Sequence, residues 1–485
     1  MNFRKILAEL DCDASYDIEI KGIHNDSRMI KPGYLFVAYP GAEADGRLFI
    51  AQAISRGARA ILYEAKAPIA NAFHSNQDVP CIPVSDLAEK LGRIAKIFYG
   101  NPSRSLNITG ITGTNGKTTI AYQLAHAFER LNRKAAYIGT LGEGRPFALH
   151  PLNNTTPDAL CLHQLLKSYK DLNIEQICME VSSHALSLKR TEGIEFSHAI
   201  YTNLSHEHLD FHRTMEAYAF AKAKLFAVPS LQSALINLDD EYAPMMIGQL
   251  PAGCKKLTYG LRKGCDVYAQ SFHTTMTGSI LDIVSPWGKC EIKTAMLGEF
   301  NLYNALAIFS HLLLNGGALQ DVIAVMATLR AVPGRMEVVA DSPCVIVDYA
   351  HTPDALENVL LTLRKLKQNR LIVVFGCGGD RDKGKRPMMG RIASDYADEV
   401  IVTSDNPRSE NPSSIIEEII AGINAETKPK IVVDRAEAIE TALNIAVTGD
   451  IILIAGKGHE SYQQIGKKRI HFSDQHVVQR LLYGS

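Results

Sequence analysis

The sequence has no CxxC pair, and its nine cysteines are scattered along the chain. An odd number of isolated thiols argues against a disulfide framework or a zinc site and is typical of a reducing compartment. The first residues, MNFRKILAELDCDAS, lack the apolar core of a secretory signal. No apolar run approaches the roughly 18 residues that a membrane-spanning helix requires. We therefore expect a cytoplasmic protein that does not insert into membranes.

The sequence also lacks a surplus of positive charge. Lysine and arginine total 51 and aspartate and glutamate total 52, which gives a formal net charge of −1. General nucleic-acid-binding proteins carry a basic surplus, so we expect no nucleic-acid partner. The hydrophobic content of 46% is ordinary for a globular protein, and 485 residues exceed what one core accommodates.

Two hydrolase motifs are missing. GxSxG does not occur, and an HExxH motif that starts at His206 would need a histidine where Asp210 stands. His206 and His212 are therefore better explained as solvated or capping histidines than as zinc ligands. The run Ser182-Ser183-His184 is explained by substrate hydrogen bonding at least as well as by nucleophilic catalysis.

A phosphate-binding pattern stands at residues 106–119, LNITGITGTNGKTT. It predicts a short strand, a glycine-rich turn and a helix, in which backbone N–H groups and the positive helix end face an anion. Lys117 adds a positive charge and Thr118 can bind Mg²⁺. The strict GxxxxGK[ST] pattern needs glycine at position 111, where the chain has isoleucine. We predict ATP or GTP binding by Gly113, Thr114, Asn115, Gly116, Lys117, Thr118 and Thr119.

The pattern along the chain predicts three domains, at residues 1–100, 101–332 and 333–485. Residues 99–103 and 333–334 are rich in glycine and proline and form plausible boundaries. The last domain is the most regular, because valine- and isoleucine-rich runs at 344–350, 370–377, 399–405, 430–434 and 450–458 alternate with helical patterns. Such runs predict a parallel sheet that is covered on both faces.

Polar residues gather after four of these strands, at 348–351, 376–381, 404–408 and 456–460. Ligands of open parallel sheets bind outside the carboxyl ends of the strands. Turn chemistry explains the glycines and prolines there, but it does not explain Arg381, Arg408 and Glu460. We therefore predict one edge of a binding site at these strand ends.

Charged side chains in the middle domain suggest a metal site. Glu180 ends one predicted strand and the run 203–210, which contains His208, ends the next. We expect these two strands to be neighbours in the sheet, and a carboxylate and an imidazole at neighbouring strand ends near Thr118 can bind Mg²⁺ on a nucleotide. Lys222 and Lys224 lie in a helical pattern at 217–226, and composition alone predicts that both face solvent.

Six motifs occur in a fixed order: TGTNGKTT (112–119), EVSSHA (180–185), NLS with HLD (203–210), GEFNLYN (298–304), PGRME (333–337) and DYAHTP (348–353). In this order they resemble the Mur ligase family across essentially the whole chain. The family consists of ATP-dependent acid–amino-acid ligases that extend the nucleotide precursor of peptidoglycan. The resemblance implies an α/β protein with an N-terminal UDP-binding domain, a central P-loop ATPase-like domain with a parallel sheet, and a C-terminal Rossmann-like domain.

The N-terminal run Asp26-Ser27-Arg28 resembles the members that add the third residue to UDP-MurNAc-L-Ala-D-Glu. The resemblance implies that the UDP-sugar contacts Asn25, Ser27, Ala42, Glu43 and Ala44. It likewise implies that the muramoyl-peptide end contacts Asn154, Thr155, Thr156, Ser182 and Arg190.

The run Asp405-Asn406-Pro407-Arg408 is similar to the pattern of members that add meso-diaminopimelate. This substrate has a distal carboxylate that lysine lacks, and a guanidinium binds a carboxylate in bidentate fashion. The resemblance adds Arg381, Gly456 and Glu460 to the same site. Asn411 stands where aspartate is usual, so an L-lysine-adding ligase remains an alternative, as does a folylpolyglutamate synthetase-like ligase.

The resemblance also implies how the reaction runs. The D-Glu γ-carboxylate attacks the ATP γ-phosphate, and the amine then attacks the acyl phosphate, so no protein nucleophile is needed. Lys117, Glu180, His208 and Lys222 would be catalytic, and Thr118, Glu180, His208 and a carbamylated Lys222 would support Mg²⁺. Asn301, Asn304, Arg335 and Asp348 would contact ATP. We expect a monomer. The alternative from another functional class is a protein that binds nucleotide without catalysing a reaction, but such a protein would not need these lysines and metal-binding residues.

Overall fold

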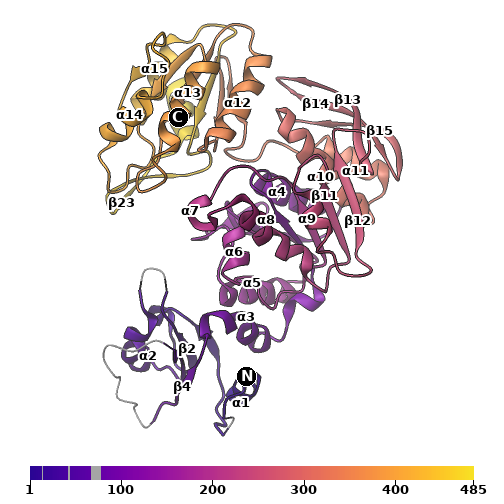
Figure 1. Ribbon diagram of the computed structural model, residues 1–485, viewed down its shortest axis with the longest axis vertical. Helices are drawn as coiled ribbons and strands as arrows, with labels where there is room; N and C mark the ends of the chain where they lie inside the picture. Colours follow the sequence, from indigo (N-terminus) through magenta and orange to yellow (C-terminus); the bar gives the residue numbers. More distant parts are fainter. Residues whose placement is uncertain (14, 42–43, 67–77, 485) are drawn as a thin grey trace.

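The computed structural model describes residues 1–13, 15–41, 44–66 and 78–484. Three sheets follow one another along the chain, with four, eleven and six strands, and a two-stranded hairpin is added near the C-terminus. Figure 1 shows the N-terminal part at the bottom, the central part in the middle and the C-terminal part at the upper left. Among the residues described, no helix is long and apolar enough to cross a membrane.

The N-terminal sheet is parallel, in the order β1-β2-β3-β4. One face packs on α1 and α3 and the other on α2, and each face has its own apolar cluster. The first cluster extends to Ala159 and Leu160 of the central part, so these two parts share buried surface. The elements are α1 (Phe3–Glu9), β1 (Gly22–His24), η1 (Ser27–Met29), β2 (Tyr34–Ala38), η2 (Gly46–Phe49), α2 (Ile50–Ser55), β3 (Ala60–Glu64), β4 (Cys81–Val84) and α3 (Leu87–Phe98).

The central sheet has the order β15-β14-β13-β12-β11-β10-β5-β9-β6-β7-β8. Its middle strands, from β13 to β6, are parallel, and antiparallel strands extend it at both ends. The strands are β5 (Asn107–Thr112), β6 (Ala135–Gly139), β7 (Gly142–Arg145), β8 (Ala148–His150), β9 (Gln176–Glu180), β10 (His198–Tyr201), β11 (Ser233–Asn237), β12 (Lys255–Gly260), β13 (Val267–Thr275), β14 (Gly278–Ser285) and β15 (Gly288–Thr294).

Helices cover both faces of the central sheet. The helix predicted after the phosphate loop is confirmed as α4, which buries Ile120, Leu124 and Phe128 fully in the cluster with α10 and α11, while Leu131 is partly buried against the same cluster. The second face packs on α5, α8 and α9. The elements are η3 (Pro102–Ser105), α4 (Lys117–Arg130), α5 (Ala159–Asp171), α6 (Ser183–Ser187), α7 (Leu209–His212), α8 (Met215–Ala223), η4 (Lys224–Ala227), α9 (Ala243–Ile247), α10 (Glu299–Leu314) and α11 (Leu319–Met326).

The C-terminal sheet, β16-β17-β21-β18-β19-β20, is parallel except for its edge strand β16. It is covered by α12, α13 and α14 on one face and by α15 and α16 on the other, as the sequence predicts. The elements are β16 (Glu337–Asp341), β17 (Cys344–Asp348), α12 (Pro353–Leu366), β18 (Leu371–Phe375), α13 (Lys385–Tyr396), β19 (Glu399–Val402), α14 (Pro412–Ile420), β20 (Lys430–Ile431), α15 (Arg435–Ile445), β21 (Ile451–Ala455), β22 (Tyr462–Ile465), β23 (Lys468–His471) and α16 (Asp474–Tyr483).

Two details of this sheet differ from the prediction. The strand expected at 430–434 has only two residues, because Asp434 accepts hydrogen bonds from Ala436 N and Glu437 N and thereby caps α15. The antiparallel strand β16 is not anticipated by the sequence pattern. It pairs with β17 through Glu337 and Val347.

A pair of buried histidines lies where β10 begins, at the opposite end of β10 from its carboxyl terminus. His198 Nδ1 is 2.7 Å from Ser233 Oγ, His311 Nε2 is 2.9 Å from Thr109 Oγ1, and the ring centroids are 5.3 Å apart. Burial lowers the pKa of His198 to about 4 and holds the pKa of His311 well below its usual 6.5. The folded chain therefore keeps both rings uncharged at pH values where the unfolded chain binds protons.

We expect this pair to make the fold sensitive to acid. The contribution of the two uncharged rings to the free energy of unfolding is fully present above pH 6.5 and is lost as the pH falls toward 4. For His198 alone, the free energy of unfolding falls by about 2 kcal/mol at pH 5. Urea unfolding at a series of pH values measures this loss. His198→Gln should flatten the profile, whereas His150→Gln, at an exposed histidine, should leave it unchanged. A free energy of unfolding that is constant between pH 7 and pH 5 contradicts the assignment.

Candidate active site

The loop between β5 and α4 has the predicted shape and depends on two glycines. Gly113 has φ 151° and Gly116 has φ 87°, values that side chains other than glycine rarely adopt. A Cβ atom at Gly113 would lie 1.8 Å from Thr202 Oγ1, and one at Gly116 would lie 2.5 Å from Asn304 Oδ1. The loop is thus fitted closely to the segment after β10 and to α10.

Two consecutive residues at the start of α4 turn in different directions. Lys117 folds back over the loop, and its Nζ donates to Gly113 O at 2.9 Å and to Thr114 O at 2.7 Å. Thr118 Oγ1 donates to Glu180 Oε2 at 2.8 Å. The helix start therefore presents an ammonium on one side and a hydroxyl–carboxylate pair on the other.

Glu180 is fully buried at the end of β9. Its oxygens accept hydrogen bonds from Tyr137 OH, Thr140 N (2.8 Å), Thr140 Oγ1 (3.2 Å) and Thr118 Oγ1. The sequence suggested that β9 and β10 are adjacent, and this is wrong, because β5 lies between them. As a result Glu180 and the segment after β10 approach the phosphate loop from its two sides.

Lys222 corrects another expectation. Composition predicts that it faces solvent, yet its side chain is 1% exposed, while Lys224 is the exposed lysine of this pair. Lys222 Nζ donates to Gly113 O at 2.7 Å and lies 4.3 Å from the centroid of the Tyr218 ring. Burial, with the Lys117 ammonium nearby, holds the pKa of Lys222 well below its usual 10.5. A larger fraction of this amine is therefore neutral at any given pH than in an exposed lysine.

His208 lines the cavity with its side chain 42% exposed. It has φ 57° and precedes α7, and partial loss of hydration lowers its pKa to about 4. The preceding Glu207 approaches His208 Nε2 at 3.7 Å and His351 Nε2 at 4.0 Å. Of the two histidines expected to be solvated or capping, His206 is exposed, but His212 is buried with its Nε2 2.9 Å from Ser183 Oγ.

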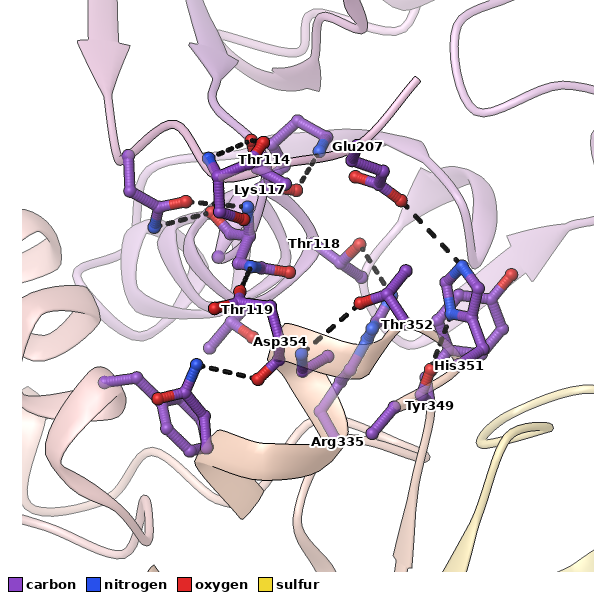
Figure 2. Close-up of a pocket in the computed structure, with 18 of the residues that line it drawn as sticks. Thr114, Lys117, Thr118, Thr119, Glu207, Arg335, Tyr349, His351, Thr352 and Asp354 are labelled. Atoms are coloured by element: carbon purple, nitrogen blue, oxygen red, sulfur yellow. Dashed lines mark hydrogen bonds and ion pairs between the residues drawn. The ribbon is translucent and has the colours of Figure 1, made fainter. Parts of the chain in front are cut away.

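These residues line one cavity of about 480 Å³ between the central and C-terminal parts. Figure 2 shows the phosphate loop on one wall and Tyr349, His351, Thr352 and Asp354 on the other. Asn115 Nδ2 donates to Asp354 Oδ2 at 3.3 Å across the cavity. Among the residues proposed for nucleotide, metal and catalysis, the cavity brings together Thr114, Asn115, Gly116, Lys117, Thr118, Thr119, Glu180, His208, Lys222, Asn301, Asn304, Arg335 and Asp348.

The C-terminal wall is anchored by Asp348 and Arg335. Asp348 accepts hydrogen bonds from Met336 N and Ala350 N, both at 2.7 Å, and burial raises the pKa of its carboxyl despite the nearby Arg335. Arg335 Nη2 donates to Thr118 Oγ1 at 3.4 Å, and its guanidinium lies 4.4 Å from the Tyr349 ring centroid. Arg335 therefore connects the C-terminal part to the start of α4.

Several cavity residues were not assigned from the sequence. Tyr349 and His351 belong to the motif at 348–353 and Asp354 follows it, but the sequence assigned them no role beyond a general site edge. Tyr218 lies in the helical pattern at 217–226 that also contains Lys222, without a role of its own. Thr140 belongs to no motif, so only the folded chain gives a signal for it.

The residues assigned to the muramoyl-peptide end lie beside Glu180. Thr155 and Ser182 line the cavity, and Thr155 Oγ1 is 3.0 Å from Thr140 Oγ1. Thr156 Oγ1 donates to Glu180 O at 2.8 Å, and Arg190 Nη1 donates to Thr156 O at 3.0 Å. Asn154 is exposed.

The residues assigned to the UDP-sugar lie in the N-terminal part. Asn25 Nδ2 donates to Tyr39 OH at 2.9 Å, and Ser27 Oγ donates to Gln52 Oε1 at 2.7 Å. Burial raises the pKa of the Tyr39 hydroxyl, although the hydrogen bond from Asn25 lowers it. Ala44 is exposed, and Ala42 and Glu43 lie outside the described residues.

The residues assigned to the third amino acid surround Gly378 and Gly456. A Cβ atom at Gly378 would lie 2.8 Å from Arg408 Nη1 and 3.9 Å from Arg381 Cγ, so both arginines flank this glycine. Arg408 Nη1 donates to Gly379 O at 2.7 Å, whereas Arg381 is exposed. A second group gathers around Gly456, where Asp405, Asn406 and Glu460 lie and where Pro407 leads to Arg408.

Family models match three parts of this chain. The Mur ligase family catalytic domain matches residues 19–99, the Mur ligase middle domain matches 111–311, and the Mur ligase glutamate ligase domain matches 334–458.

Individual relatives and solved structures also resemble this chain over almost its whole length. UDP-N-acetylmuramoyl-L-alanyl-D-glutamate--2,6-diaminopimelate ligase of Chromobacterium violaceum is 44% identical over 470 residues, which cover 96% of this chain and 94% of that protein. A solved structure of a ligase with the same name has a TM-score of 0.70 and 36% identity, covering 100% of this chain and 99% of the other. MurF ligase from Thermotoga maritima in complex with ADP has a TM-score of 0.66 and 19% identity, covering 92% and 95%, and shows the shared fold alone.

Proposed function

This chain belongs to the Mur ligase family, and on that basis we propose that it joins meso-2,6-diaminopimelate to the D-Glu γ-carboxylate of UDP-MurNAc-L-Ala-D-Glu at the expense of ATP. One observation carries the proposal. A single cavity holds the phosphate loop, Glu180 and Lys222 on one side and the C-terminal strand ends on the other. The scattered free cysteines support a cytoplasmic protein of peptidoglycan synthesis.

We propose that ATP binds between the phosphate loop and the C-terminal wall of the cavity. The loop glycines allow the backbone to approach the phosphates, and Lys117 neutralises negative charge on the group that is transferred. Asn301, Asn304, Arg335 and Asp348 surround the other end of the nucleotide. The cavity of about 480 Å³ falls within the size range of small-molecule sites.

The first chemical step needs an acceptor close to the γ-phosphate. The D-Glu γ-carboxylate attacks the phosphorus, which gives an acyl phosphate and ADP. The amine of diaminopimelate then attacks the acyl carbon, and phosphate leaves. Lys117 is a preorganised cation for the charge that develops on the transferring group. Ser182 and Arg190 hold the peptide so that the carboxylate faces the loop.

The residues present fit Mg²⁺. No group of three or more histidine, cysteine, aspartate or glutamate side chains forms a metal cage within the described ranges. Mg²⁺ in phosphoryl-transfer sites typically uses one or two protein oxygens and completes its shell with phosphates and water. Thr118 and Glu180 supply such oxygens at the end of the loop, with His208 nearby, and bound Mg²⁺ would supply neutralisation of phosphate charge. A carbamate on Lys222 would add a further carboxylate-like group.

The arginines at the C-terminal strand ends support diaminopimelate. Arg408 and Arg381 flank Gly378, where two guanidinium groups can bind a distal carboxylate. L-lysine has no such group, and an unpaired guanidinium repels its ammonium. The high identity to a diaminopimelate ligase over almost the whole chain also favours this substrate over folylpolyglutamate chemistry.

The direct test is turnover by the purified protein. We expect phosphate release and a tripeptide product of the corresponding mass with ATP, Mg²⁺, UDP-MurNAc-L-Ala-D-Glu and meso-diaminopimelate. L-lysine in place of diaminopimelate should give a much lower rate. Turnover with L-lysine but not with diaminopimelate overturns the proposed specificity. Absence of turnover with either amino acid overturns the proposed substrates.

A second test concerns the loop. Gly116→Ala places a Cβ 2.5 Å from Asn304 Oδ1 at a positive φ, so we expect ATP to bind at least about tenfold more weakly. Gly100→Ala is the matched control, because Gly100 has φ 71° and nothing within 4 Å of its added Cβ. Equal ATP affinity for the two variants, measured by calorimetry, refutes the placement of ATP on this loop.

A further inference from the structure

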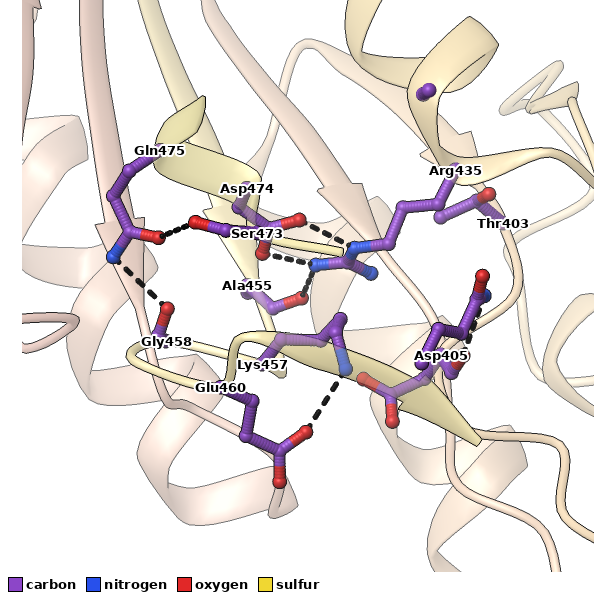
Figure 3. A network of polar contacts seen from close by, with 12 residues as sticks. Thr403, Asp405, Arg435, Ala455, Lys457, Gly458, Glu460, Ser473, Asp474 and Gln475 are labelled. Carbon is purple, nitrogen blue, oxygen red and sulfur yellow. Dashed lines mark hydrogen bonds and ion pairs between the residues drawn. The ribbon is translucent and has the colours of Figure 1, made fainter. Parts of the chain in front are cut away.

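Arg435 and Lys457 are completely buried cations beneath the carboxyl ends of the C-terminal strands (Figure 3). Arg435 in α15 binds both oxygens of Asp474 at 2.8 Å, and its Nη2 also donates to Ala455 O at 3.0 Å. Asp474 is buried as well. Arg435 is therefore neutralised inside the scaffold by a residue outside the proposed substrate site.

Lys457 binds residues of the proposed amino-acid site instead. Its Nζ donates to Glu460 Oε2 at 2.9 Å and to Asn406 Oδ1 at 3.2 Å. Asn406 Nδ2 donates in turn to the same Glu460 oxygen at 2.8 Å. The three side chains form a closed set in which each binds the other two.

This set fixes both polar ends of Asn406 and one oxygen of Glu460. Asn406 Oδ1 also accepts Gln464 N at 2.9 Å, so its amide has one orientation that satisfies all donors. Within the described part of the chain, Glu460 Oε1 accepts no hydrogen bond. Lys457 therefore directs Glu460 so that one oxygen is bound and the other stays available.

The same stretch of chain also holds the backbone beside Arg408. Gln463 Nε2 donates to Asp405 O at 2.8 Å, and Arg408 N donates to Gln464 O at 3.0 Å. Both glutamines belong to β22, which follows Glu460. The guanidinium and the carboxylate of the site are thus built on one scaffold.

Burying an ammonium is unfavourable unless it is well paired, and an apolar side chain would fill the same space with a smaller penalty. Packing alone does not account for a lysine at this position. Three donors on one atom, however, can hold an amide and a carboxylate together.

We infer that Lys457 is a positioning residue for the amino-acid substrate, an inference that rests on the proposed ligase function. Lys457 holds Glu460 and Asn406 together so that Glu460 Oε1 receives a substrate ammonium while Arg408 receives its carboxylate. The distal end of diaminopimelate carries both of these groups on one carbon.

Lys457→Met removes the donors and keeps the length of the side chain. We expect the KM for diaminopimelate to rise about tenfold or more, because Glu460 and Asn406 lose a charge-assisted partner. The KM values for ATP and for UDP-MurNAc-L-Ala-D-Glu should change by less than about twofold. Lys467→Met, at an exposed lysine between β22 and β23, is the control and should match the wild type.

A double-mutant cycle separates positioning from general structure. In a Glu460→Gln background, Lys457→Met should raise the KM for diaminopimelate by less than about twofold, because Lys457 acts through Glu460. The double variant Glu460→Gln/Lys457→Met carries neither charge, so it leaves no unpaired charge at this position, and it serves as the comparison if the Lys457→Met variant folds poorly. Effects that multiply, or equal rises in all three KM values, overturn the inference. If the wild-type protein shows no turnover, the ligase function itself is contradicted. If the wild type is active and Lys457→Met has the same KM for diaminopimelate, only the role of Lys457 is contradicted.

Discussion

Lys222→Met should lower kcat by about 10²–10³-fold, the usual loss when one preorganised electrostatic group is removed from an active site. Lys222 is buried beside the phosphate loop, and its depressed pKa favours the neutral amine that reacts with CO₂. In the proposed reaction a carbamate on Lys222 would be negative and would support Mg²⁺. Methionine fills the same buried space without charge, so the melting temperature should be maintained while activity falls.

The exposed Lys224, two residues away, gives the matched control, and Lys224→Met should keep wild-type activity. Carbon dioxide separates the carbamate from a simple cation. Wild-type activity should fall in CO₂-depleted buffer and return with bicarbonate, more strongly at lower pH because protonation of the amine competes with carbamylation. If CO₂ depletion has no effect on the wild type, Lys222 acts as an amine and the carbamate assignment is wrong.

Arg408→Ala should lower kcat/KM for meso-diaminopimelate about 30–150-fold, which corresponds to about 2–3 kcal/mol for a charge-assisted bidentate contact. Arg408 is held with φ 51° by backbone hydrogen bonds to Gln464 and Gly466, and its side chain reaches over Gly378. L-lysine has no distal carboxylate, so its kcat/KM should change far less. Parallel measurement with both amino acids therefore gives the specificity directly.

Arg391→Ala is the control for this experiment. Arg391 lies in α13 of the same domain with its side chain 71% exposed, and it contacts Asp395 one turn later at 3.6 Å. Its removal should change neither substrate's kcat/KM. Equal losses for diaminopimelate and L-lysine in Arg408→Ala would place the arginine on a group that both substrates share, and the specificity argument would fail.

The sequence predicts the parts of this site that depend on consecutive residues. Residues 106–119 contain a strand, a glycine turn and a helix start, and the structure has all three because their hydrogen bonds and φ angles are local. The C-terminal doubly wound sheet is predicted for a similar reason, since each apolar run is long enough to be a buried strand. Where a local signal competes, the prediction is less accurate, as at Asp434, where a helix cap shortens β20.

By itself, then, the sequence determined the phosphate loop, the covered parallel sheets and the family resemblance, because each of these features depends on residues that are close together in the sequence. Tertiary structure decided which charged groups are buried and what they contact. Lys222 and Lys224 look equivalent in the helical pattern, but only Lys222 reaches Gly113, which is 109 residues away. Lys457 and Asn406 are 51 residues apart and meet only because β19 and β21 end at the same edge of the sheet. Burial sets the pKa of a lysine and the partner of a carboxylate, and burial depends on the fold of the whole chain.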